Sequence, residues 1–131
     1  MEKEFVPYEL ALELEQLGFD ERCLAWYQDY TLRVDVNANQ SIKFHEHLGR
    51  FKGCFLAPLY QQAFRWFREK YDLDSEIYMN HELGVKFYTY LILQLERAVI
   101  THKLGYTGRF DTYEEAEPAC LQKLIEIVKT K

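Results

Sequence analysis

An apolar stripe between residues 59 and 71 constrains the fold more than any other feature of this sequence. Tyr60, Phe64, Phe67 and Tyr71 are separated by four, three and four positions, a spacing that places them on one side of an α-helix. The same side also carries Leu59, Ala63 and Trp66, and the opposite side carries Gln61, Gln62, Arg65, Arg68 and Glu69. A cofactor-binding helix needs convergent polar groups within such a stripe, and this stripe has none. It therefore predicts a helix packed into a hydrophobic core.

The composition is that of a folded protein with a substantial core. The 131 residues, 48% of them hydrophobic and 28% charged, suit a single domain covering residues 1–131. The aromatic share of 16% favours β-sheet content. The net charge of −5 is spread over both halves of the chain, which disfavours non-specific binding to nucleic acid or to an anionic membrane.

The sequence also indicates a compartment. The first residues, "MEKEFVPYEL", lack the apolar segment of a signal peptide, and no apolar run is long enough to span a bilayer. Three cysteines at wide and irregular spacing, Cys23, Cys54 and Cys120, are typical of free thiols in a reducing environment. We therefore expect a cytoplasmic protein that does not enter membranes.

The residues near the N-terminus predict a short amphipathic helix. Pro7 suits the first position of a helix, and Gly18 suits the left-handed residue that follows its end. Leu10, Leu14 and Leu17 lie between them at positions that share one side of the helix.

Residues 24–36 predict a β-hairpin that turns around Gln28-Asp29. The alternating apolar side chains expected to face the core are Leu24, Trp26, Leu32, Val34 and Val36. Residues 37–41 predict a polar loop, and residues 42–48 and 54–56 predict short strands before the central helix begins near Ala57.

Residues 85–104 predict two further strands. β-Branched and aromatic residues favour a strand, a turn and a return strand through 98–104. A helix that begins at Leu91 is the alternative, because "LQLERA" contains good helix formers. The side of the strand expected to face the core carries Val85, Phe87, Leu91, Leu93 and Leu95.

Residues 110–131, "FDTYEEAEPACLQKLIEIVKTK", predict a C-terminal helix. Asp111 with Glu114, or Thr112 with Glu115, has the spacing of a capping box at its start. Its apolar side carries Ala116, Cys120, Leu124 and Ile127 or Val128. Hairpins interspersed with helices, without a βαβ repeat, predict an α+β fold in which a mostly antiparallel sheet packs about three helices on one face.

Three stretches together resemble an uncharacterised family of small proteins encoded by gut bacteria and their phages or prophages. They are "YELALELEQLGFDE", "LAPLYQQAFRWFREKYDLDS" and "FDTYEEAEPACLQKLIEIV". The resemblance covers less than half of the chain, and Pro118 departs from it because family members have another residue there. No activity, cofactor or site residue can be carried over. The resemblance implies an accessory protein of a mobile element that acts in the bacterial host cytoplasm.

The strongest metal-binding candidate is the pair His45 and His47. On a strand, these side chains would point the same way about 7 Å apart, with His81, His102 or Cys54 as a third ligand. Two solvated histidines explain the pattern more simply. We therefore predict no metal and no cofactor.

No constellation in the sequence supports an enzyme. The cysteines border strands or lie on an apolar helix side, which is typical of buried and unreactive thiols. The cluster "EEAE" is explained by the start of a helix, and no phosphate-binding or hydrolase motif is present. We predict no catalytic residues.

Two candidate interaction surfaces remain. Arg65 and Arg68, with Lys43, Arg50 and Lys52, could form a modest basic patch, although an ordinary solvated helix face explains them more simply. Tyr27, Tyr88, Tyr90 and Ile92 fall on the side of the strands opposite the expected core, which predicts an exposed aromatic sheet face.

The predicted function follows from the second surface. We expect a small non-enzymatic binding protein that docks a protein partner, or a second copy of itself, through the aromatic face. The alternative is a module for single-stranded nucleic acid, with tyrosines stacked on bases and arginines on phosphates. The acidic charge makes nucleic acid the less favoured partner.

Overall fold

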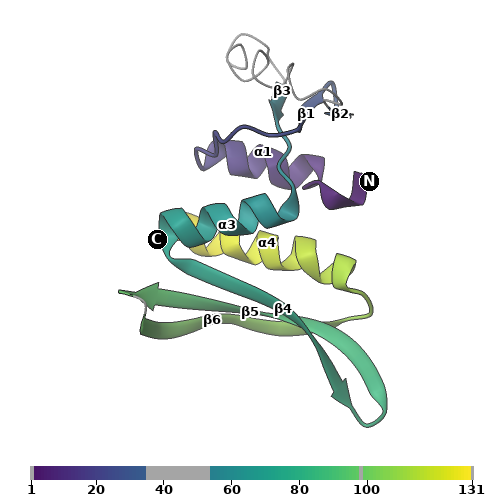
Figure 1. Ribbon diagram of the computed structural model, residues 1–131, viewed down its shortest axis with the longest axis vertical. Helices are drawn as coiled ribbons and strands as arrows, with labels where there is room; N and C mark the ends of the chain where they lie inside the picture. The colour runs from purple at the N-terminus through teal and green to yellow at the C-terminus, as the bar shows by residue number, and fades with distance from the viewer. Residues whose placement is uncertain (1, 35–53, 98, 131) are drawn as a thin grey trace. The chain divides into compact units, whose positions relative to one another are not determined.

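The computed structural model describes residues 2–34, 54–97 and 99–130, and the chain divides into two compact units, Met1–Gln62 and Ala63–Lys131 (Figure 1). The predicted α+β class is confirmed, with helices α1, α3 and α4 and mostly antiparallel strand pairing. The described strands form two three-stranded sheets, whereas we expected one shared layer. The extent of a single domain over residues 1–131 stays a prediction.

The first unit holds one small sheet beside helix α1. It contains a short 3-10 helix (Glu2–Glu4), α1 (Tyr8–Gln16), β1 (Ala25–Gln28), β2 (Thr31–Val34) and β3 (Cys54–Leu56). The strand order is β2-β1-β3, with both pairs antiparallel. The Tyr8 ring of α1 lies 4.9 Å from the Phe55 ring of β3, centroid to centroid, so aromatic side chains join the helix to the sheet.

The predicted N-terminal helix and its glycine cap are confirmed. Gly18 has φ +95°, and its backbone N–H donates to the Glu15 carbonyl oxygen. The N–H of Phe19 donates to the carbonyl oxygen of Leu14, which completes a Schellman motif. Both Leu14 and Phe19 are buried, as the hydrophobic contact that accompanies this motif requires.

The predicted hairpin is present, but the inward side of its first strand, β1, is the opposite of the one we expected. Leu32 and Val34 of β2 lie opposite Tyr27 and Ala25 and so face inward, as predicted. Asp29 and Tyr30 form a two-residue turn in which both residues have positive φ, the signature of a type I′ turn. Ala25 and Tyr27 are buried, while Leu24 is 48% exposed. The reason is local packing, because the Tyr27 ring contacts both Tyr8 and Phe55.

The central helix α3 (Tyr60–Tyr71) confirms the apolar stripe that the sequence predicts. Tyr60, Phe64 and Phe67 are buried, and so is Trp66, whose ring meets that of Phe67 edge to face at 5.1 Å. Residues on the opposite side, including Arg65 and Arg68, are exposed.

The second unit contains the rest of α3, the strands β4 (Leu73–Glu82), β5 (Val85–Glu96) and β6 (Val99–Phe110), and α4 (Tyr113–Lys129). The strand order is β4-β5-β6, and both pairs are antiparallel. The strand prediction for residues 85–104 is confirmed and the alternative helix from Leu91 is wrong. Pairing of β5 with strands on both sides, with Ile92 fully buried between them, outweighs the helix propensity of "LQLERA".

The capping box of α4 is the one formed by Thr112 and Glu115. The Thr112 hydroxyl accepts a hydrogen bond from the Glu115 backbone N–H at 3.2 Å, and the Glu115 carboxylate accepts one from the Asp111 N–H. The helix continues through Pro118. Its predicted apolar side is buried, with Ala116, Cys120 and Leu124 fully inaccessible to solvent.

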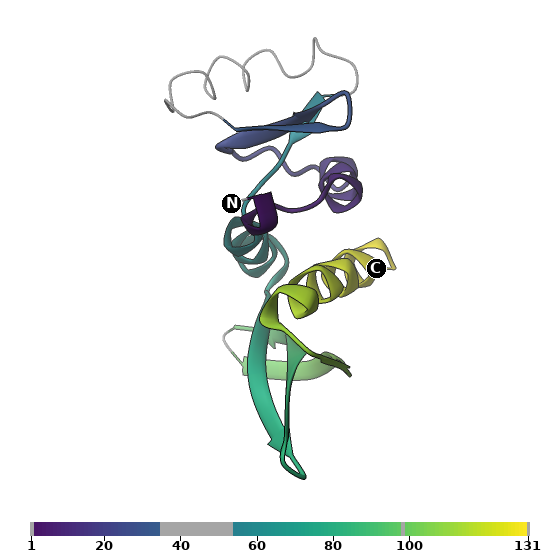
Figure 2. The same ribbon diagram turned by 90° about the vertical axis from the view of Figure 1, so that its right-hand side faces the viewer.

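Helix α4 lies along one side of the second sheet, as both views of the ribbon show (Figures 1 and 2). The Tyr113 ring of α4 contacts that of Tyr88 at 6.0 Å, and the thiol of Cys120 hydrogen-bonds to Ser75. Side chains in register with Tyr88 and Ser75 therefore belong to the helix-covered face, which carries Leu73, Ser75, Ile77, Met79, Tyr88, Tyr90 and Ile92. The other side, the open face, carries Asp74, Glu76, Tyr78, Asn80, Glu82, Val85, Phe87, Thr89, Leu91, Leu93 and Leu95.

Candidate functional site

The open face carries a row of apolar side chains along its central strand. Leu91, Leu93 and Leu95 follow one another at every second position of β5, and each is only half-buried. The row is extended by Val85 near one end and by Ile100 of β6, which pairs with Leu95; these two are 57% and 56% exposed. An apolar row that no helix covers marks a candidate interaction surface.

An acidic row lies beside the leucines on β4. Glu76 is directly opposite Leu91, and Asp74 is directly opposite Leu93. Arg68 of α3 lines a shallow hollow of about 240 Å³ together with these residues and Ser75. Neither Asp74 nor Glu76 is in an ion pair with another residue that the structure describes. Two carboxylates against one arginine leave this part of the open face negative.

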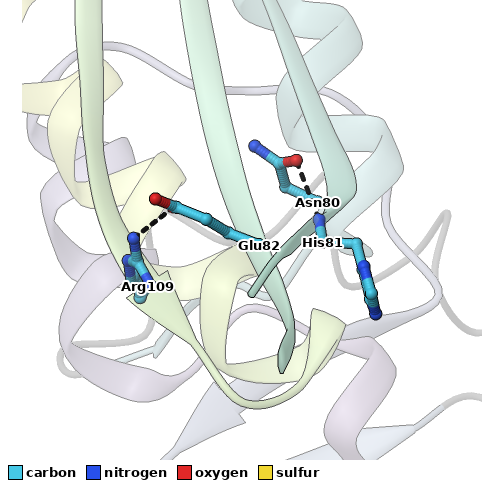
Figure 3. Close-up of polar contacts among 4 residues, drawn as sticks. All are labelled: Asn80, His81, Glu82 and Arg109. Atoms are coloured by element: carbon cyan, nitrogen blue, oxygen red, sulfur yellow. Dashed lines mark hydrogen bonds and ion pairs between the residues drawn. The ribbon is translucent and has the colours of Figure 1, made fainter. Parts of the chain in front are cut away.

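A second hollow of about 260 Å³ lies farther along the open face, lined by Asn80, Glu82, Phe87, Thr89, Gly108 and Arg109. The Arg109 guanidinium lies 4.5 Å from the Phe87 ring centroid and pairs with the Glu82 carboxylate (Figure 3). Because the ion pair joins β6 to β4 across β5, Phe87 is nearly inaccessible although it lies on the open face. The charges of this hollow neutralise each other.

Three residues of the predicted aromatic surface are buried, so the expectation that they form an exposed face is wrong. Tyr90 and Ile92 lie on the helix-covered face, where Tyr90 stacks on Phe110 at 6.2 Å and Ile92 has no exposed surface. Tyr27 is 7% exposed, and its hydroxyl donates a 2.8 Å hydrogen bond to the Val6 carbonyl oxygen. Tyr88 alone is half-buried, between Tyr113 and Lys86.

The predicted arginines are both exposed on α3, and only Arg68 joins the candidate surface. The other members of the predicted basic patch, Lys43, Arg50 and Lys52, lie outside the described residues, as do His45 and His47. Within the described residues, no group of three or more His, Cys, Asp or Glu side chains is arranged to hold a metal ion.

The three cysteines are buried free thiols. Burial raises the pKa of the Cys23 and Cys120 thiols to about 12, with smaller effects from neighbouring groups, and it also raises the pKa of Cys54. A thiol with so high a pKa is protonated near neutral pH and is a poor nucleophile.

From the sequence we expected the apolar residues of the open face to lie in the core. These residues are Val85, Phe87, Leu91, Leu93 and Leu95. The signal that could have identified them is the pairing of the leucine row with an acidic strand, since carboxylates opposite Leu91 and Leu93 are costly to bury. Comparisons of the chain with protein-family models, curated proteins and solved structures give no match. No helix in the described part of the chain is long and apolar enough to cross a membrane.

Proposed function

We propose that this chain is a non-enzymatic binding protein that docks a protein partner through the open face of the β4–β5–β6 sheet. The observation that carries the proposal is the row Leu91, Leu93 and Leu95, which lies on the sheet face opposite α4. Covering apolar surface of this kind with a partner is favourable by roughly 25 cal/mol for each Å² removed from water.

The dimensions of the sheet suit such a contact. Three strands about 4.8 Å apart present a surface roughly 10 Å wide, which one segment of a partner can cover. The exposed Val85 and Ile100 would extend the apolar contact along the strand direction. Asp74 and Glu76 would form a charged rim on one side, as is common at protein interfaces.

The absence of catalytic function is part of the proposal. The buried thiols have raised pKa values, and the two hollows on the open face present an ion pair and a pair of carboxylates. The cytoplasmic location and the role as an accessory protein of a mobile element are also proposals, and they rest on the sequence.

The experiment is affinity capture from a bacterial cytoplasmic extract with the full chain as bait. We expect a double variant, Leu91→Ser with Leu93→Ser, to lose the captured partner. The control is Leu24→Ser, because Leu24 is an exposed leucine of the first unit and does not belong to the open face. Capture of the same proteins by the double variant and the wild type would contradict the proposal.

A second double variant serves as a test in case Leu91→Ser with Leu93→Ser does not fold. Val85 and Ile100 are each more than half exposed, so Val85→Ser with Ile100→Ser should leave the fold intact and still weaken capture. A titration with single-stranded DNA at low salt tests the nucleic-acid alternative. We expect no binding, because the open face presents the carboxylates of Asp74 and Glu76 to the phosphates.

A further inference from the structure

The outer edge of β4 can be assigned residue by residue from two hydrogen bonds. The Leu95 N–H donates to the Asp72 carbonyl oxygen, so the even-numbered residues of this strand direct their backbone groups toward β5. The N–H of His81 donates instead to the side-chain oxygen of Asn80 at 2.8 Å (Figure 3). Both observations place the backbone N–H and C=O groups of Ser75, Ile77 and Met79 on the outer edge, about 6.8 Å apart.

This edge carries the acidic side chains of Asp74, Glu76 and Glu82 but lacks other features that usually prevent further strand pairing. β4 pairs with β5 through ten consecutive residues without a bulge, whereas the β5–β6 pairing is interrupted three times. The sequence of β4, "LDSEIYMNHE", contains no proline, glycine or lysine. Among the hydrogen bonds of the described residues, the one that a β4 backbone N–H donates to a side chain is that of His81, at the far end of the strand. A regular edge whose charged side chains are acidic is a template for an added strand that carries basic residues.

We propose that the β4 edge binds an extended segment of a protein partner in which apolar and basic residues alternate. The inference rests on the proposed function, because it specifies which part of the protein partner is recognised and where. The backbone of the segment would pair with Ser75, Ile77 and Met79, as in other cases of strand addition. Its side chains would then alternate between the two faces of the enlarged sheet.

The alternation follows from the side chains of β4. On the open face, a residue opposite Glu76 meets an exposed carboxylate that has no ion pair among the described residues, so a lysine or arginine fits there. On the helix-covered face, residues opposite Ile77 and Met79 meet apolar side chains, of which Met79 is 52% exposed. Apolar residues fit at these positions.

A second copy of this chain is a poorer occupant. Antiparallel pairing of β4 with itself about Ile77 places the two Glu76 side chains diagonally across the new interface on one face. Each copy also carries a net charge of −5. Repulsion between like charges therefore disfavours the self-paired edge, and a basic segment removes it.

The probe is a synthetic peptide of about seven residues with alternating valine and lysine, added to the ¹⁵N-labelled full chain at low ionic strength. We expect hydrogen exchange of the Ser75, Ile77 and Met79 amides to slow by at least about tenfold. A valine–glutamate peptide and a peptide with the same valines and lysines in two blocks should bind at least about tenfold more weakly.

Ile77→Pro is the decisive variant. It removes the central outward N–H at a position where proline is tolerated in an edge strand, so β4 should keep its pairing with β5. We expect it to weaken binding of the valine–lysine peptide by at least about tenfold, whereas Ile77→Val, which retains the N–H, binds as the wild type does. Glu76→Lys should reverse the preference between the lysine and glutamate peptides.

Several outcomes would overturn the proposal. They are undiminished binding to Ile77→Pro, no binding of the valine–lysine peptide to the wild type, and protection of the edge by dimerisation of the chain alone. If Ile77→Pro does not fold, N-methylation of the peptide takes its place. Methyl groups on the amides that face β4 should abolish binding, and methyl groups on the alternate amides should not; equal effects would also overturn it.

The captured partner distinguishes a failure of strand addition at the β4 edge from a failure of the proposed docking through the open face. If Leu91→Ser with Leu93→Ser loses the captured partner while Ile77→Pro retains it, the open face is the binding surface and strand addition is wrong. If the double leucine variant still captures the partner, the proposed function is wrong whatever the peptide does.

Discussion

The Arg109 guanidinium pairs with the Glu82 carboxylate at 2.5 Å and thereby joins the two outer strands of the second sheet across β5. The pair itself is largely exposed, at 60% and 55% of the two side chains. Its position matters more than its charge, because the guanidinium covers the ring of Phe87 at 4.5 Å. A side chain on the open face is in this way shielded from water without a covering helix.

Removing this cover should destabilise the protein modestly. We expect Arg109→Ala to lower the free energy of unfolding by about 1 kcal/mol, from the lost cation–π contact and a surface ion pair. Glu82→Gln should cost less than about 0.5 kcal/mol, because the guanidinium can remain on the ring. Urea unfolding at low and high salt measures both, and the Arg109→Ala effect should persist at high salt. Equal effects that both vanish in salt would show that the ring contact contributes nothing.

The hydroxyl of Tyr27 has a structural role that Tyr27→Phe tests. The substitution keeps the ring but leaves the Val6 carbonyl oxygen without this donor, so we expect a loss of about 1 kcal/mol in the free energy of unfolding. Tyr30→Phe is the matched control, since Tyr30 is 79% exposed in the hairpin turn and its hydroxyl makes only a surface hydrogen bond with Tyr8. It should change stability by less than about 0.5 kcal/mol. Thermal and urea unfolding measure the effect. An unchanged free energy of unfolding in Tyr27→Phe would contradict the stabilising role of this buried hydrogen bond.

Two glycines with positive φ should differ in their tolerance of alanine. A Cβ atom at Gly108, where φ is +96°, would lie 2.7 Å from the Phe110 ring, whereas one at Gly84, where φ is +78°, meets nothing within 4 Å. We expect Gly108→Ala to lower the free energy of unfolding by about 2 kcal/mol or more, and Gly84→Ala by about 1 kcal/mol from the backbone alone. Thermal unfolding of both variants is the measurement, and the reverse order would contradict the packing around Gly108.

The Cys120 thiol should make stability depend on pH under alkaline conditions. Burial raises its pKa from 9.0 to about 12, so the unfolded chain releases this proton at a lower pH than the folded chain does. The stabilising contribution is complete below pH 9 and is lost as the pH rises toward 12. The slope from this one group reaches at most about 1.4 kcal/mol per pH unit.

Cys120→Ala isolates this effect from the ionisation of the tyrosines. We expect the variant to be less stable near neutral pH, because the smaller side chain leaves a cavity in the hydrophobic core beside α4. Above pH 9 it should lose stability less steeply than the wild type, because it has no thiol to ionise at this position. Urea unfolding of both proteins over a series of pH values gives the two slopes. Parallel curves would mean that the folded protein ionises Cys120 as readily as the unfolded chain does.

Much of the local structure follows from the sequence. The stripe from Tyr60 to Tyr71, the glycine after α1 and the Thr112–Glu115 cap each depend on contacts within a few residues, and each is present as predicted. The strand over residues 85–96 also follows from its composition, although Leu91 begins a stretch of helix formers. Composition and periodicity suffice where the competing structures differ locally.

The candidate site is a different matter, because both sides of β5 are apolar. Alternation separates Leu91, Leu93 and Leu95 from Tyr88, Tyr90 and Ile92, but it does not say which set faces a helix. We assigned the leucines to the core and the aromatic set to the surface, and the burial of Tyr90 and Ile92 reverses that assignment. The covered side is selected by α4, which is distant in sequence from Ser75 and packs against it through Cys120.

The sequence alone thus determined the α+β class, the helical stripes and the strands, since these depend on residue periodicity and on backbone groups close in the chain. Tertiary structure decided the grouping of strands into two sheets, the outward direction of the Ser75, Ile77 and Met79 amides, and the face left to the leucines. Those features depend on which distant surfaces bury each other, and a two-sided apolar strand gives the same periodicity for either choice.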